Sequence, residues 1–131
     1  MTIGIAQRTI GRPLDRPLSA FDIPKTLAEL RAEKEFQRSG HNAIILHKED
    51  GLKVVVVAIR AGRNIESHRA VAPITVQVLE GSISVNTEKD SLLLRKGELL
   101  VLHSGLAHDV KAMEDAAFLL TLAGPGPASS R

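Results

Sequence analysis

The chain of 131 residues contains five histidines and no cysteine. Without cysteine there are no disulfides, thiolate metal sites or cysteine nucleophiles, so a metal would need imidazole or carboxylate ligands. His68, His103 and His108 lie where short apolar runs meet turn residues, and His103 precedes His108 by five residues across such a turn. Imidazoles in this setting either bind a transition metal or orient a small ligand by hydrogen bonding.

Other residue types that carry chemistry give weaker signals. His41 and His47 stand at the two ends of one apolar run and are expected at the surface. Asp109 directly follows His108, so its side chain is expected on the opposite face of a strand, in a structural role. No serine lies in a nucleophile-elbow pattern, and the glycine-rich tail has no lysine or following helix to hold a phosphate. Serine hydrolysis and nucleotide binding are therefore not supported.

Composition excludes several classes of partner. The 17 basic and 15 acidic residues are interleaved, the net charge is +2, and there is no Trp or Tyr. The electrostatic footprint and stacking platforms of a nucleic-acid-binding protein are therefore missing. Residues 1–9 lack the features of a secretion signal, and the longest aliphatic run, 54–59, is too short to cross a bilayer. We expect a cytoplasmic protein with no membrane or nucleic-acid partner.

The punctuation of the chain predicts one domain with two extensions. Residues 1–20 mix prolines, glycines and arginines and are expected to form an arm, whereas 124–131 are expected to be a mobile tail. Between them, 21–123 predict a single domain that begins with one helix over 22–38. Asp22 supplies a cap for this helix, and a glycine after its last turn stops it.

After the helix the sequence becomes a series of short β-prone runs separated by turn residues. Even spacing of short strands, with no helices between them, is typical of a sandwich or jelly roll and argues against a parallel sheet. The sequence therefore predicts an all-β fold. The expected strands are 41–47, 52–60, 74–79, 83–86, 92–94, 99–102, 109–113 and 117–122.

Two segments resemble the two conserved motifs of the cupin superfamily. The first family motif is Gly, five residues, His, one residue, His, three or four residues, Glu, six residues, Gly. Gly62, His68 and Gly81 match it at the right intervals. The second His position, however, holds Ala70, and the Glu position holds Ile74.

The second family motif is Gly, five residues, Pro, one residue, Gly, two residues, His, three residues, Asn. Gly97, Gly105 and His108 fit this spacing. His103 stands at the Pro position and Ala112 at the Asn position. The stretch from the start of the first motif to the end of the second, 62–112, spans about 50 residues, and the flanking predicted strands extend the likeness over 41–123.

The resemblance implies a cupin-type double-stranded β-helix barrel. In metal-binding cupins, three His and one Glu converge inside the barrel on an ion such as zinc, nickel, iron or manganese. The resemblance implies His68 and His108 as the remaining ligands, with His103 as a third nitrogen if its ring turns inward. The alternative for His103 is a place at the rim or in a turn. The predicted ligand pocket comprises His68, Ala70, Ile74, Val76, His103 and His108.

Three functions remain open at this point. The first is a small-molecule-binding protein whose barrel takes a largely apolar or weakly anionic ligand, with a divalent metal held by the reduced histidine set. The second is a metal-dependent oxygenase or isomerase with an irregular ligand set. The third is a sensor or interaction module without chemistry of its own. For the first of these functions, the resemblance implies a homodimer paired through edge strands, with the arm covering such an edge.

Overall fold

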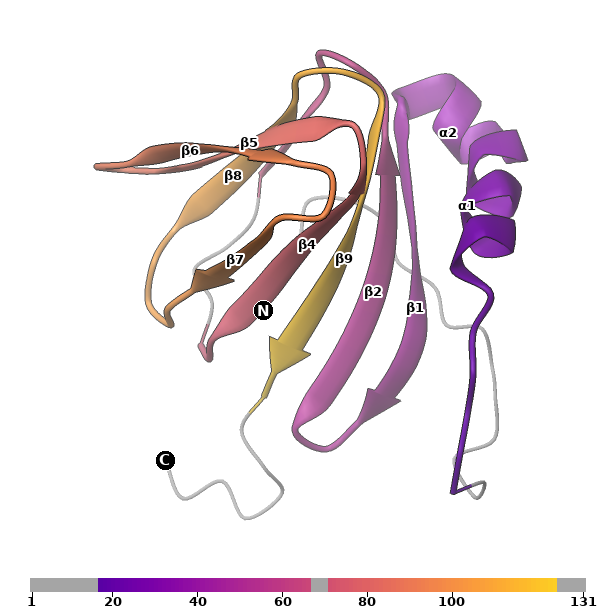
Figure 1. Ribbon diagram of the computed structural model, residues 1–131, viewed down its shortest axis with the longest axis horizontal. Helices are drawn as coiled ribbons and strands as arrows, with labels where there is room; N and C mark the ends of the chain where they lie inside the picture. Colours follow the sequence, from indigo (N-terminus) through magenta and orange to yellow (C-terminus); the bar gives the residue numbers. More distant parts are fainter. Residues whose placement is uncertain (1–16, 67–70, 125–131) are drawn as a thin grey trace.

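The computed structural model describes residues 17–66 and 71–124 (Figure 1). Most of the predicted arm and nearly all of the predicted tail therefore lie outside the described residues. The described part contains two helices followed by nine strands. The elements are α1 (Ile23–Ala32), α2 (Lys34–Ser39), β1 (His41–Glu49), β2 (Leu52–Ile59), β3 (Asn64–Glu66), β4 (Ile74–Glu80), β5 (Ser82–Thr87), β6 (Ser91–Arg95), β7 (Leu99–Leu102), β8 (His108–Ala112) and β9 (Ala116–Ala123).

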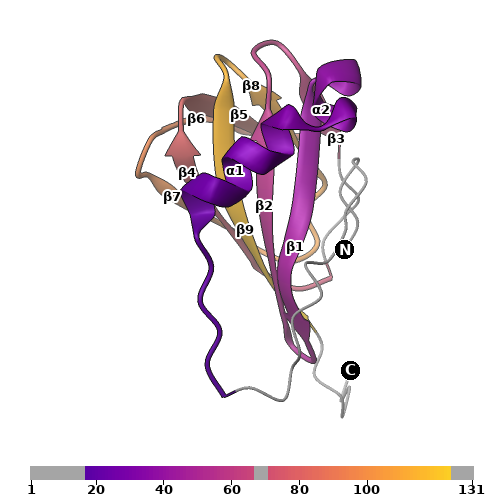
Figure 2. The same cartoon turned by 90° about the vertical axis from the view of Figure 1, so that its right-hand side faces the viewer.

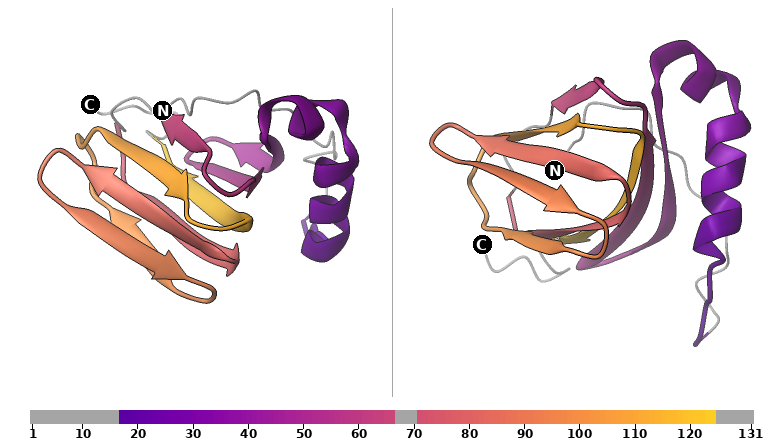
Figure 3. Two further views of the ribbon diagram at one scale, coloured as in Figure 1. Left: turned by 90° about the horizontal axis from the view of Figure 1, so that it is seen from above. Right: turned by 45° about the horizontal axis from the view of Figure 1, so that its top comes forward.

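The strands form two antiparallel sheets, as the sequence predicts. The five-stranded sheet has the order β1-β2-β9-β4-β7, and the four-stranded sheet has the order β3-β8-β5-β6. After β2 the chain alternates between the two sheets, except that β5 and β6 form a hairpin within the four-stranded sheet, and this is the jelly-roll arrangement. Figure 3 shows the sheets curving around a common interior, with both helices outside it. The all-β barrel prediction is confirmed.

Side-chain alternation separates the barrel interior from the helix side. In β2, Val55, Val57 and Ile59 point into the barrel, whereas Val56 and Ala58 point toward the helices. Successive residues of a strand face opposite sides of the sheet. A strand made only of aliphatic residues is therefore expected where both faces of the sheet are covered. The interior is closely packed and almost entirely aliphatic. Its buried members include Ile65, Ile74, Val76, Val78, Ile83, Val85, Leu94, Leu100, Leu102, Val110, Phe118, Leu120 and Leu122.

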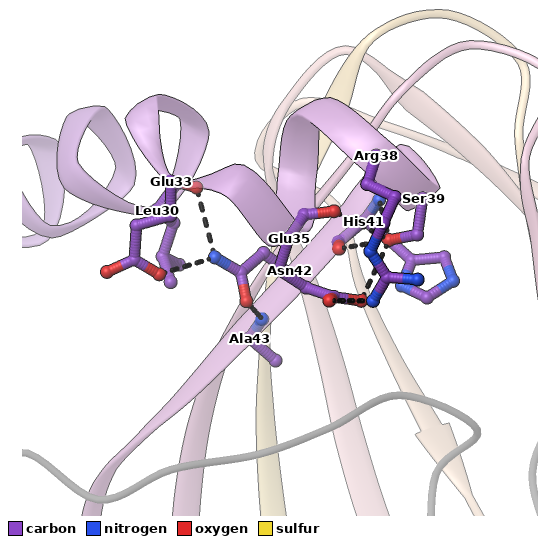
Figure 4. A network of polar contacts seen from close by, with 8 residues as sticks. All are labelled: Leu30, Glu33, Glu35, Arg38, Ser39, His41, Asn42 and Ala43. Carbon is purple, nitrogen blue, oxygen red and sulfur yellow. Dashed lines mark hydrogen bonds and ion pairs between the residues drawn. The ribbon is translucent and has the colours of Figure 1, made fainter.

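The single helix predicted over 22–38 is wrong in one respect, because it is broken in two at Glu33. Asp22 caps α1 as expected, accepting a hydrogen bond from the Lys25 N–H at 3.1 Å. At Glu33 the backbone turns extended, with ψ 154°. The buried amide of Asn42 explains the break, since its Nδ2 donates to the Leu30 carbonyl at 3.0 Å and to Glu33 Oε1 at 2.8 Å (Figure 4). At the break the Leu30 carbonyl thus accepts from the Asn42 side chain and, at 3.4 Å, from the Glu33 N–H.

One short strand was not predicted. β3 has three residues, and Asn64 and Ile65 pair with Lys111 and Val110 of β8. So short a run gives no readable alternation, and its pairing partner lies more than forty residues further along the chain. Among the described residues, no helix is long and apolar enough to cross a membrane.

Gly81 shows why one motif glycine cannot be replaced. It lies between β4 and β5 with φ +71°, in the left-handed region. A Cβ at this position would come within 2.2 Å of the Asp115 carbonyl oxygen. The turn that carries the chain from one sheet to the other therefore needs glycine for both conformation and space.

Candidate functional site at the open end of the barrel

His108 begins β8 and faces the barrel interior. In this strand His108, Val110 and Ala112 are buried, while the side chains between them are more exposed. His108 retains 8% of its accessible surface. Its register partner is Thr87, at the end of β5, so the two polar side chains stand on the same inner face of neighbouring strands.

The surroundings of His108 favour the neutral imidazole. Its Nδ1 lies 3.3 Å from the Leu106 carbonyl oxygen. A carbonyl only accepts, so this contact corresponds to the tautomer with the proton on Nδ1 and the lone pair on Nε2. Burial lowers the pKa of His108 below its usual 6.5, and the Leu106 carbonyl and Asp109 only partly oppose this. A neutral imidazole is the form that binds a metal or exchanges hydrogen bonds with an uncharged ligand.

A cleft of about 350 Å³ opens beside Thr87, between the β5–β6 hairpin and β7. Its floor is formed by core residues, and its walls include Leu92 and Leu106, which are 55% and 43% exposed. Charged side chains occur only at the hairpin turn on its rim. The lining residues are Val85, Thr87, Glu88, Lys89, Asp90, Leu92, Leu100, Val101, Leu102, Leu106 and Ala107.

The predicted pocket residues are only partly brought together. Ile74 and Val76 are each 1% exposed and point into the interior, as the strand parity of β4 predicts. Val76 belongs to the packed core, and Ile74 also lines a second cavity of about 240 Å³ near the β1–β2 turn. His68 and Ala70 lie outside the described residues, so their part of the prediction stays a prediction.

His103 is exposed in the segment between β7 and β8. This position agrees with the rim alternative and not with an imidazole turned into the barrel. Of the three histidines predicted as metal ligands, His103 and His108 lie within the described residues. Only His108 of these two faces inward.

The described residues do not by themselves fit a metal ion. Among them, no group of three or more His, Cys, Asp or Glu side chains gathers closely enough to hold one. The position of the family's Glu ligand is occupied by Ile74, which is hydrocarbon and fully buried. Transition-metal sites that react with substrate generally need at least three protein ligands. Of the described residues, only His108 offers an inward imidazole.

Asp109 has the structural role predicted for it. It lies on the outer face of the four-stranded sheet, where its Oδ1 accepts a hydrogen bond from Asn86 Nδ2 at 2.8 Å. Asn86 Oδ1 in turn accepts from the hydroxyls of Ser84 and Ser91. This ladder ties β8, β5 and β6 together on the side away from the cleft.

The two remaining histidines differ from each other. His47 Nε2 lies 2.5 Å from Glu49 Oε1 in a partly exposed contact, close to the surface position expected. His41 is half-buried, which corrects the surface prediction, and its Nδ1 is buried without a hydrogen-bond partner among the described residues. Burial lowers the pKa of His41, with Glu35 opposing and Arg63 adding to the effect.

Sequence reasoning missed Thr87 and the two cleft leucines. The position of Leu92 could have been inferred from the sequence. It lies on the same face of β6 as the buried Leu94, and it is next to a charged turn at the end of the strand. Nothing local marks Leu106, whose contact with the cleft depends on how the β7–β8 segment folds over the barrel mouth.

The sequence matches no protein-family model and no curated protein sequence. Solved structures do match in shape. A cupin superfamily protein from Desulfitobacterium hafniense DCB-2 is 13% identical, with a TM-score of 0.66, over 85% of this chain and 93% of that one. An RmlC-like cupin from Shewanella frigidimarina is 17% identical, with a TM-score of 0.59, over 65% and 77%.

A larger enzyme contains a similar barrel. Salicylate 1,2-dioxygenase from Pseudoaminobacter salicylatoxidans is 20% identical, with a TM-score of 0.65. The match covers 76% of this chain and 30% of the dioxygenase chain. At these identities the likeness concerns the fold, and a shared fold does not transfer an activity. The two antiparallel sheets, their strand order and these structural neighbours agree: the chain has the cupin fold.

Proposed function

We propose that the protein binds a small, largely apolar molecule at the open end of its barrel and orients it through His108. The observation that carries this proposal is an aliphatic cleft of about 350 Å³ whose lining residue Thr87 is the strand partner of the buried, inward-facing His108. Ligand pockets are typically apolar concavities of this size with a few convergent polar groups. Thr87 is such a group in the cleft lining, and we assign the second role to His108, which pairs with Thr87 and follows the lining residue Ala107.

The lining indicates the chemistry of the ligand. Seven of the cleft residues are aliphatic, so most of the ligand surface should be hydrocarbon. The rim carries Glu88 and Asp90 against one Lys89, which disfavours a strongly anionic molecule. An uncharged or weakly anionic compound with one hydrogen-bonding group fits best.

Binding is tested by titrating the isotope-labelled protein with small uncharged aliphatic and aromatic compounds and following chemical shifts by NMR. His108→Gln should weaken the tightest compound about tenfold, because the imidazole contact is lost. His103→Gln, which changes an exposed ring nearby, is the matched control and should leave the affinity unchanged.

A second pair of variants tests the cleft itself. Leu106→Asp places a charge on the cleft wall and should abolish binding, whereas Met113→Asp changes a similarly exposed apolar side chain in the β8–β9 turn and should not. Equal affinities for all four variants would contradict the proposal. Native mass spectrometry of the freshly purified protein would then identify any molecule held elsewhere.

A metal-dependent oxygenase or isomerase is the second candidate. It is favoured by the neutral state of His108 and by the dioxygenase among the structural neighbours. It needs His68 to bring a second imidazole to His108 and a further ligand from outside the described residues. Metal analysis of protein incubated with zinc, nickel, iron or manganese and then desalted decides it. About one equivalent retained by the wild type and lost in His108→Gln would support this candidate, and no retained metal would exclude it.

A further inference from the structure

The second cavity, of about 240 Å³, lies at the end of the five-stranded sheet where β1 turns into β2. Backbone hydrogen bonds fix its frame. The Gly124 N–H donates to the Gly51 carbonyl at 3.2 Å, which holds the end of β9 beside the hairpin turn (Figure 1). The Ala123 N–H donates to the Pro73 carbonyl, also at 3.2 Å, which ties in the start of β4. The lining residues are Lys48, Glu49, Asp50, Gly51, Leu52, Lys53, Val71, Ala72, Ile74, Leu122, Ala123 and Gly124.

The strand register places two lysines and two core residues in one row across this sheet. Lys48 of β1 is opposite Lys53 of β2. Lys53 is in turn opposite Leu122 of β9, and Leu122 is opposite Ile74 of β4. Residues opposite each other in an antiparallel pair lie on the same face of the sheet. Because Leu122 and Ile74 belong to the barrel core, both lysines are on the interior face, at the end of their strands.

This arrangement of the lysines is unfavourable for the protein alone. Like charges directly opposite each other on neighbouring strands repel. Burial lowers the pKa of Lys53 below its usual 10.5, and the charge of Lys48 lowers it further. Neither lysine forms an ion pair within residues 17–66 and 71–124. An anion placed between the two ammonium groups would turn the repulsion into two attractive contacts.

The two carboxylates that line the cavity do not take this role. Glu49 follows Lys48 along β1, so it points to the opposite face of the sheet, where its Oε1 lies 2.5 Å from His47 Nε2. Asp50 is exposed in the turn itself. Neither carboxylate raises the pKa of Lys53, which is shifted only by burial and by Lys48. The positive charge is therefore available to a ligand.

We propose that this cavity binds a small carboxylate that carries a hydrocarbon chain. The carboxylate lies between the ammonium groups of Lys48 and Lys53. The chain lies against Ile74 and Leu122, whose buried hydrocarbon favours an apolar group over a hydrated one. The cavity shares no lining residue with the cleft between the β5–β6 hairpin and β7, so this site does not depend on the function proposed for the cleft.

Isothermal titration calorimetry of the full chain with hexanoate tests the proposal. Lys53→Gln should weaken hexanoate binding about tenfold, because a charge-assisted contact is lost. Lys111→Gln removes an exposed lysine from the outer face of the other sheet and is the matched control, which should leave the affinity unchanged. Hexanamide, which keeps the chain without the charge, should bind about tenfold more weakly than hexanoate. Acetate, which keeps the charge without most of the chain, should also bind at least about tenfold more weakly.

Two further measurements separate binding from folding. The free energy of unfolding of Lys53→Gln should be at least that of the wild type, since the substitution removes a like-charged pair. Saturating hexanoate should raise the pKa of Lys53, read from its side-chain NMR signals, because a bound carboxylate favours the ammonium form. The cleft variant Leu106→Asp should bind hexanoate as the wild type does.

Four results would each overturn the proposal. They are the absence of hexanoate binding, equal affinities for hexanoate and hexanamide, an affinity unaffected by Lys53→Gln, and loss of hexanoate binding in Leu106→Asp. The last result would place the carboxylate in the cleft, whereas failure of the cleft proposal alone would leave the effect of Lys53→Gln unchanged.

Discussion

The two sides of the barrel differ in what covers their apolar strands. Over β1 and β2, helices α1 and α2 bury Leu27, Leu30 and Phe36 against the outer face of the five-stranded sheet (Figure 2). At the opposite side, β6 and β7 expose leucines and a valine to solvent. The same type of residue therefore stabilises the fold on one side and is available for binding on the other. Exposed apolar groups that gather in one place generally mark a binding surface.

The polar groups show the same contrast. On the helix side, the buried Asn42 satisfies three partners, since it donates to Leu30 and Glu33 and accepts from the Ala43 N–H (Figure 4). A fully satisfied buried amide fixes the angle at which the helices meet the sheet. On the open side, the inward-facing Thr87 lines a cleft, and His108 is its partner on the neighbouring strand.

The largest expected effect comes from removing the covered packing. Leu30→Ala should lower the free energy of unfolding by about 3 kcal/mol, because Leu30 is 1% exposed and its loss leaves a cavity. Leu99→Ala, on the open side, should change it by less than about 0.5 kcal/mol. Urea unfolding followed by circular dichroism measures both. Equal losses would mean that the open side is as important for stability as the covered one.

A smaller effect is expected from the polar clamp at the helix break. Asn42→Ala removes the side-chain partner of the Ala43 N–H and leaves the Leu30 carbonyl with only the longer contact from the Glu33 N–H, 3.4 Å, in a buried setting, at a cost of about 2 kcal/mol. Asn86→Ala, which interrupts the half-exposed ladder on the outer sheet face, should cost less than about 1 kcal/mol. The same unfolding measurement compares them, and the reverse order would contradict the importance given to the clamp.

The smallest effect concerns pH. The pKa values of His41 and His108 are lowered by burial from 6.5, so the unfolded chain takes up these protons before the folded chain does. The free energy of unfolding should therefore decrease as the pH falls from about 6.5 toward the folded-state pKa values. Above about 6.5 these two histidines should not change it. His41→Gln and His108→Gln should each flatten part of this slope. A slope unchanged in both variants would show that neither ring is buried in the neutral form.

Much of the barrel is predictable because alternation and turn residues are local signals. β7 has the bounds expected, and the other strands foreseen differ by one or two residues at their ends. The break at Glu33 is not local, since it depends on Asn42 reaching back twelve residues to Leu30. Likewise, strand parity predicted that the side chains of Ile74 and Val76 point into the barrel. Whether such a side chain lines a pocket or packs in the core depends on distant strands, and the structure places Val76 in the core.

The site was less predictable than the fold for the same reason. The motif spacing predicted an inward-facing His108, and strand parity predicted that Asp109 lies on the outer face; the structure has both orientations. The cleft, however, arises where the hairpin of β5 and β6 stands apart from β7, and no sequence pattern reports the separation of two strands from different sheets. His103 matches a motif position in spacing, yet its exposure follows from the path of the β7–β8 segment.

The most direct test is a crystal structure of the protein with the tightest-binding compound from the NMR titration. The account predicts that the compound lies between β6 and β7, against Leu92 and Leu106, with a polar atom within hydrogen-bonding distance of His108 Nε2. Density for the compound in the cavity near Leu52 and Leu122, or anywhere out of reach of His108, would contradict it.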